Sequence, residues 1–209
     1  MNTKAKGYLL GAVAAATYGM NPLFALPLYK AGMDPDSVLF FRYLFAIPLL
    51  GIMLKARGRD FKLHRREIVP LVLLGLLVAL SSLSLFLRYN YMDAGLLFKG
   101  SDGSTLNITG TVLVMVSALS YAIYIVGVNR PVLKSVATLK VTFYVLLFGL
   151  LLYVVRLDFG MAVHVPDKWY LWGNLLALAV FPTAISFLCT TSAIQYIGST
   201  PTAILGALE

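Results

Sequence analysis

One stretch of this chain, residues 37–67, limits the possible folds more than any other, because it joins an apolar segment of membrane length to a dense basic loop. The apolar part runs from about Val38 to Leu54. At a helical rise of about 1.5 Å per residue it covers most of a hydrocarbon core about 30 Å thick. Six cations follow it, namely Lys55, Arg57, Arg59, Lys62, Arg65 and Arg66. Short loops rich in lysine and arginine stay in the cytoplasm, so this stretch predicts a span that ends at the cytoplasmic face.

The composition indicates the same class of protein. Of the 209 residues, 59% are hydrophobic and only 12% are charged, whereas soluble domains are about 45–50% apolar and about 25% charged. The net charge of +8 lies in loops between apolar segments, so it does not indicate a nucleic-acid partner. The single cysteine, Cys189, excludes an intramolecular disulfide. We predict an integral membrane protein whose main partner is the lipid bilayer.

Six apolar segments are long enough to cross a membrane, and a shorter one follows them. The segments run approximately over Tyr8–Tyr29, Val38–Leu54, Val69–Leu87, Gly110–Val128, Thr138–Val155 and Trp169–Cys189, and a terminal half-helix begins at Ser199. Residues 88–109 contain no such segment and are predicted to be a polar connector. The loop cations are concentrated on one side when the N-terminus is placed in the cytoplasm. The predicted fold is an all-α polytopic bundle of about six spans with a cytoplasmic N-terminus.

A weak internal repeat divides the chain into residues 1–100 and 101–209. Three dipeptides of the first part have counterparts about 100 residues later: Thr17-Tyr18 with Ser120-Tyr121, Arg42-Tyr43 with Phe143-Tyr144, and Asn90-Tyr91 with Gln195-Tyr196. Three spans per copy is an odd number, so the second copy would enter the membrane from the opposite side. Inverted repeats of this kind are typical of secondary transporters, which bind substrate near the midplane between the copies.

The sequence contains no enzyme motif, and no cysteine or histidine cluster with metal-ligand spacing, so it predicts neither catalysis, a metal site nor a cofactor. Its unusual groups are a buried cation and helix-breaking prolines. Arg42 lies within the second apolar segment, where an ionisable residue suggests function. Pro22 and Pro182 each remove a backbone donor and leave a carbonyl that must find a partner or line a polar cavity.

We predict a substrate site formed by six residues of these segments: Tyr18, Asn21, Arg42, Tyr121, Tyr124 and Ser186. A buried arginine facing the bundle would bind a carboxylate or phosphate. Three alternatives stay open at this point. The prolines could simply kink packed helices. Arg42 could extend its long side chain to the outer interface. The tyrosines and serine could serve ordinary packing between helices.

Four motifs give the chain a family resemblance. They are Ala16–Asn21 (ATYGMN), Phe40–Tyr43 (FFRY), Tyr89–Ala94 (YNYMDA) and Ala193–Tyr196 (AIQY). The chain resembles EamA-type members of the drug/metabolite transporter superfamily. The resemblance implies a carrier of the bacterial inner membrane, built from two inverted five-helix repeats with ten spans. Such carriers, many of them exporters, move amino acids, other metabolites or drugs by alternating access around a central cavity.

The chain departs from this plan in two places. After Gly95 a fourth helix and most of a fifth are missing, and Ala207–Glu209 resembles only the start of the fourth helix of the second repeat. The expected fold is therefore an incomplete ten-helix bundle. Our first hypothesis is a secondary transporter of a small metabolite, with an anionic group that Arg42 would bind. The alternative is a transport-incompetent fragment, or a subunit that forms a homo-oligomer to cover its exposed faces.

Overall fold

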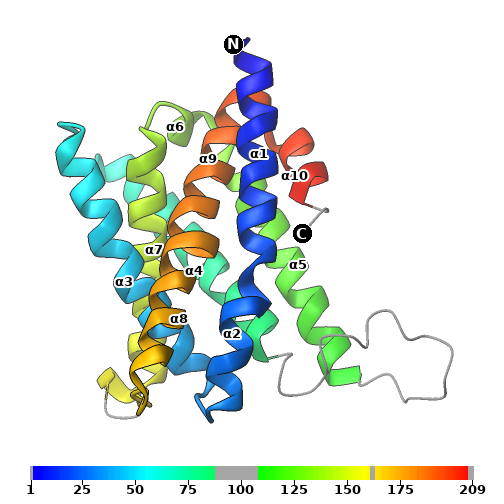
Figure 1. Ribbon diagram of the computed structural model, residues 1–209. Helices are drawn as coiled ribbons and strands as arrows, with labels where there is room; N and C mark the ends of the chain where they lie inside the picture. Colours follow the sequence, from blue (N-terminus) through cyan, green and yellow to red (C-terminus); the bar gives the residue numbers. More distant parts are fainter. Residues whose placement is uncertain (1, 88–107, 161–162, 207–209) are drawn as a thin grey trace, which may run out of the picture.

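The helices of the computed structural model, which describes residues 2–87, 108–160 and 163–206, lie side by side in a single bundle (Figure 1). Within these ranges six helical segments are long and apolar enough to cross a membrane, as predicted. The elements are α1 (Thr3–Gly19), α2 (Asn21–Lys30), α3 (Pro35–Ala56), α4 (Arg65–Leu87), α5 (Ile108–Val128), α6 (Pro131–Lys134), α7 (Thr138–Arg156), η2 (Asp158–Gly160), α8 (Trp169–Ala179), the π-helix η3 (Val180–Ile185), α9 (Ser186–Ile197) and α10 (Ser199–Gly206).

Two of the six spans are broken helices, and each break lies at a proline that the sequence analysis named as helix-breaking. The first span consists of α1 and α2, which meet at Met20 immediately before Asn21-Pro22. The sixth consists of α8, η3 and α9, with Pro182 inside η3. This span continues to Ile197, beyond the predicted end at Cys189. The positive φ of Gly198, 87°, then separates α9 from the terminal half-helix α10.

The other predicted boundaries are close to the observed ones, with one instructive difference. We expected the second span to begin at about Val38, but α3 begins at Pro35 because the carboxylate of Asp34 caps it. An Asp34 oxygen accepts a hydrogen bond from the Ser37 backbone N–H at 2.8 Å. The connector is likewise shorter than predicted at its far end, since Ile108 and Thr109 belong to α5.

The long helices pack in a pattern that pairs the two parts of the chain. α1 packs along α9, α5 packs along α4, and α3 packs along α7. α1 and α5 run in opposite directions through the bundle (Figure 1). α4 and α7 approach closely because small residues meet there. A Cβ atom on Gly75 would lie only 2.7 Å from the Val145 carbonyl oxygen.

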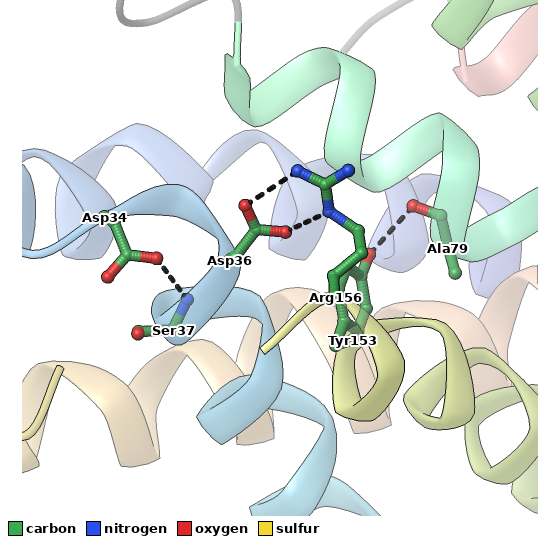
Figure 2. A network of polar contacts seen from close by, with 6 residues as sticks. All are labelled: Asp34, Asp36, Ser37, Ala79, Tyr153 and Arg156. Atoms are coloured by element: carbon green, nitrogen blue, oxygen red, sulfur yellow. Dashed lines mark hydrogen bonds and ion pairs between the residues drawn. The ribbon is translucent and has the colours of Figure 1, made fainter. Parts of the chain in front are cut away.

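The two ends of the bundle differ in charge. The N-terminus, the basic loop between α3 and α4, and α6 lie at one end (Figure 1); we call it the basic end. Polar side chains link α3, α4 and α7 (Figure 2), close to where α3 begins and α7 ends, away from the basic end (Figure 1). Arg156 of α7 donates two hydrogen bonds to Asp36 of α3, at 2.6 and 3.1 Å. Tyr153 of α7 donates one to the Ala79 carbonyl of α4, at 2.8 Å.

Some predicted features lie outside the described residues. These are the motif around Asn90-Tyr91, the remainder of the predicted connector, and Ala207–Glu209.

Candidate functional site

The centre of the bundle contains a buried cation. Arg42 projects from α3 and its side chain is inaccessible to solvent. Its Nε donates a hydrogen bond to the hydroxyl of Thr183, and its Nη2 donates one to the Pro182 carbonyl oxygen at 3.0 Å. Both acceptors belong to the π-helix of the sixth span. The guanidinium therefore points into the bundle, and the alternative in which Arg42 reaches the outer interface does not hold.

The π-helix explains how this span can hold an arginine. Pro182 has no N–H, so the Leu178 carbonyl lacks its normal helical partner. The hydroxyl of Thr183 takes that place by donating to the Leu178 oxygen at 2.8 Å. The same hydroxyl oxygen accepts the bond from Arg42. The carbonyl that the sequence predicted to be freed is thus partnered, and the arginine is held by the turn that contains it.

Arg42 keeps one nitrogen without a partner. Among the described residues its Nη1 has no hydrogen-bond acceptor. The faces of two aromatic rings lie nearby, since the guanidinium carbon is 5.9 Å from the ring centroid of Tyr18 and 5.4 Å from that of Phe86. Rings at this range attract a cation without competing for its hydrogen bonds. Because hydrogen bonds between two charged groups are the strongest, Nη1 would bind an anionic group more strongly than a neutral one.

The three predicted tyrosines come together in one row. Tyr18 stacks on Tyr121 with ring centroids 6.4 Å apart, and Tyr121 stacks on Tyr124 at 5.8 Å. Phe187, which the sequence analysis did not select, packs edge-on against both Tyr18 and Tyr124. The row joins α1, α5 and α9, and Tyr18 connects it to Arg42. Tyr121 and Tyr124 are three positions apart on α5, so helical spacing is consistent with their contact, whereas the contacts with Tyr18 and Phe187 depend on the packing of separate helices.

Asn21 lies at the break between α1 and α2, less than one helical turn after Tyr18. Its side chain is 3% exposed, and neither its amide nitrogen nor its amide oxygen has a hydrogen-bond partner among the residues that the structure describes. A buried unpartnered amide group costs about 1–3 kcal/mol. Such a group is typical of a site that a ligand completes.

The other two predicted site residues are already bonded. Ser186 donates to the Ala14 carbonyl at 3.1 Å and so ties α9 to α1. The fully buried hydroxyl of Tyr124 lies 3.3 Å from that of Thr191. The packing alternative considered for the serine describes its observed contact, and Tyr124 contributes its ring rather than a free hydroxyl.

A second polar cluster lies next to Arg42 and was not found from the sequence. Tyr43 is fully buried, and its hydroxyl lies 3.1 Å from the Ser82 hydroxyl of α4. Its ring meets that of Tyr153 edge-on at 5.2 Å. In the sequence, Tyr43 was noted only in the internal repeat and in the Phe40–Tyr43 motif, and it was not selected for the site. The significance of the dipeptide Arg42-Tyr43 is that neighbouring residues of α3 point to different partners, one to the sixth span and the other to α4 and α7.

Within the described ranges no carboxylate is bonded to Arg42. Arg156 pairs with Asp36, and His164 pairs with Asp34, at the end of the bundle opposite the basic loop. Those ranges also contain no group of three histidine, cysteine, aspartate or glutamate side chains able to hold a metal ion. The chemistry available at the centre is therefore binding by a cation, an amide and aromatic rings.

Comparison with known proteins identifies one family. The model of the EamA-like transporter family matches residues 108–209. No curated protein and no solved structure matches the chain. The matched segment begins at the first residue of α5 and includes Tyr121, Tyr124, Thr183 and Ser186. The resemblance predicted from the motifs is thus confirmed: residues 108–209 match the EamA-like transporter family, which is part of the drug/metabolite transporter superfamily.

Proposed function

We propose that this protein is a secondary transporter that moves a small metabolite with an anionic group, such as the carboxylate of an amino acid, across the membrane. The observation that carries the proposal is the state of Arg42. It is a fully buried cation with two nitrogens fixed by the sixth span and the third, Nη1, without a partner among the described residues. Two fixed nitrogens orient the guanidinium, and we assign the remaining one to the ligand.

The proposed site gives each residue a distinct role. Arg42 binds the anionic group, and Asn21 donates to and accepts from a second polar group of the substrate. The stacked rings of Tyr18 and Tyr121 form an aromatic wall. Tyr124 extends that wall, and Ser186 holds α9 against α1 beside it. The site thus selects for charge and for a hydrogen-bonding substituent.

The packing supports an alternating-access mechanism based on two inverted repeats. In the proposed repeat, α1 corresponds to α5, α3 to α7, and α4 to α9. The contact of α1 with α9 then corresponds to that of α5 with α4, and the contact of α3 with α7 corresponds to itself. Tyr18 and Tyr121, which the internal repeat pairs, stack directly on each other. In the proposed cycle the two halves rock about this contact, so that the site opens first to one side and then to the other.

The proposed setting is the bacterial inner membrane, with the basic end in the cytoplasm. Lys4, Lys6 and the basic loop lie at the same end of the bundle, as the positive-inside rule requires. We take the direction to be export, following the family resemblance.

Reconstitution into liposomes tests the proposal. Vesicles loaded with unlabelled amino acids or small carboxylates should accumulate the matching radiolabelled compound by exchange, and Arg42→Met should reduce this accumulation strongly. Arg57→Met removes a cation from the exposed basic loop and is the matched control. Equal exchange by Arg42→Met and the parent would remove Arg42 from the site. Absence of exchange for every compound, with a folded protein, would favour the transport-incompetent alternative.

A further inference from the structure

A groove between α4 and α5 has no role in the proposed transport site. It has a volume of about 560 Å³ and lies on the part of these helices nearest the basic end. Its lining is apolar except for one residue, Arg130, and consists of Val69, Pro70, Leu73, Leu74, Leu77, Ala122, Ile123, Val126, Gly127 and Arg130. Val69, Leu73 and Val126 are 64%, 56% and 62% exposed, so the groove opens to the surroundings of the bundle.

The mouth of the groove is cationic. Arg130 lines the groove at the edge nearest the basic end, just after α5 ends. Arg66 precedes Val69 by three residues and Pro70 by four, which places it on the groove-facing side of α4, one turn nearer the basic end. Arg66 and Arg130 are both exposed, and within the described residues neither makes an ion pair. Two guanidinium groups without an ion-pair partner among the described residues thus lie at the end of the apolar groove nearest the basic end.

A second hollow adjoins the same helix end. It has a volume of about 580 Å³ and is lined by His64, Arg65, Arg66, Glu67, Val132 and Ser135. The N–H of His64 is bonded to the Glu67 carboxylate at 3.1 Å, so the one acidic lining residue caps α4. Arg66 lines this hollow and also faces the groove, so one side chain can serve both. The surface combines a polar, cationic pocket with an apolar groove directly beneath it.

We propose that this surface is a binding site for an anionic phospholipid. The phosphodiester would lie between Arg66 and Arg130, the remainder of the headgroup would occupy the polar hollow, and one acyl chain would lie in the groove along α4 and α5. Basic pockets between membrane helices suit anionic headgroups, and arginine binds phosphate oxygens in pairs. The bound lipid would cover the junction of α4 and α5.

The test measures lipid retention by the purified protein. Protein in mild detergent is mixed with phosphatidylglycerol or phosphatidylcholine, and bound lipid is counted by native mass spectrometry. Phosphatidylglycerol should bind more tightly. Each of Arg66→Gln and Arg130→Gln should weaken its binding about 5-fold, and the double variant about 25-fold. Arg57→Gln with Arg59→Gln changes the net charge equally in the loop between α3 and α4, at residues that line neither the groove nor the hollow, and should leave binding unchanged.

A second pair of variants tests the acyl-chain groove without changing charge. Leu73→Trp fills the groove and should reduce phosphatidylglycerol binding, whereas Leu76→Trp, on an exposed part of α4 outside the groove, should not. Equal binding of the two lipids, or equal effects of the two tryptophan variants, would overturn the proposal. Full displacement of the lipid by glycerol 3-phosphate at matched concentration would also overturn it, because that result describes an anion site with no acyl chain.

Discussion

The two broken spans of this protein use proline in opposite ways. In the sixth span, the carbonyl that Pro182 frees is hydrogen-bonded, since Thr183 donates to the Leu178 oxygen and the same turn holds Arg42. In the first span, the Met20 N–H at the break is bonded to the Tyr18 carbonyl. The side chain beside it, Asn21, has no partner among the described residues.

The two breaks lie against each other. α1 contacts the π-helix, and Phe24 of α2 stacks on Phe181 of η3 with ring centroids 6.0 Å apart. The break in the sixth span is therefore the binding turn for Arg42, which we call the socket, and the break in the first span carries an amide group without a partner among the described residues. We infer that the sixth span positions the arginine and the first span supplies a group that changes partner during transport. This division gives each break a different response to mutation.

The largest effect is expected from Arg42→Met. Transport should fall about 10- to 100-fold, because a hydrogen bond to a charged group contributes about 1.5–3 kcal/mol. Stability should change by less than about 1 kcal/mol, since removing a buried charge also removes the cost of its burial. Exchange in liposomes and thermal unfolding in detergent measure the two quantities. If the variant is strongly destabilised while its folded fraction exchanges substrate normally, Arg42 has a structural role. That result would contradict the proposed difference between the two breaks.

The socket itself should respond in the opposite way to Thr183→Val. This change leaves the Leu178 carbonyl and the Nε of Arg42 without partners. It should lower the free energy of unfolding by about 1–3 kcal/mol. Thr183→Ser retains the hydroxyl and is the control, which should keep most of the stability. A valine variant as stable as the parent would show that the π-helix does not depend on this hydroxyl.

Asn21→Leu tests the unsatisfied break. Leucine has a similar volume and needs no hydrogen bond, so stability should be equal to or higher than that of the parent. Transport should fall about 10-fold, the effect of losing one hydrogen bond of about 1.4 kcal/mol to the substrate. A loss of stability instead would mean that Asn21 has a structural partner in the membrane.

Much of the fold follows from local features of the sequence. The apolar segments predict the six spans because only their length and hydropathy matter, and Pro22 and Pro182 mark the breaks because a proline acts on its own helix. The position of Arg42 within an apolar segment marked it as a candidate for burial, but the sequence left open whether its side chain reaches the outer interface. The end of the sixth span was misjudged because Thr190 and Thr191 interrupt the apolar segment, although both are buried in the bundle.

The partner of Arg42 could not be found in this way. Thr183 is 141 positions away, and their bond depends on how α3 and the sixth span are aligned. No local signal in the sequence indicated Thr183 either, because threonine in a helix normally bonds carbonyls three or four positions back, whereas Thr183 reaches Leu178, five positions back, in a π-helix. In the row of rings, only the contact of Tyr121 with Tyr124 had a local signal, their spacing of three on α5, because the other contacts depend on the packing of separate helices.

The smallest effect is expected at the end of the bundle opposite the basic loop, where, unlike at the breaks, carboxylates are bonded. Burial would raise the pKa of Asp34, but hydrogen bonds from the Ser37 backbone, the Ser37 hydroxyl and His164 outweigh it and lower that pKa below its ordinary value. The ionised form is therefore favoured by folding. Its contribution to stability is complete above the unfolded pKa of about 3.9 and is lost as the pH falls through the lower, folded value.

Thermal unfolding of the parent and of Asp34→Asn, measured between pH 7 and pH 3, isolates this contribution. Asparagine retains the helix cap but does not titrate. The parent should lose its advantage over the variant only below about pH 4, and the difference should be less than about 1 kcal/mol because the Asp34–His164 contact is partly exposed. Arg42→Met should show the same pH dependence as the parent, since neither break contains a carboxylate or a histidine. If that dependence is altered instead, the breaks are coupled to this polar cluster and do not act separately.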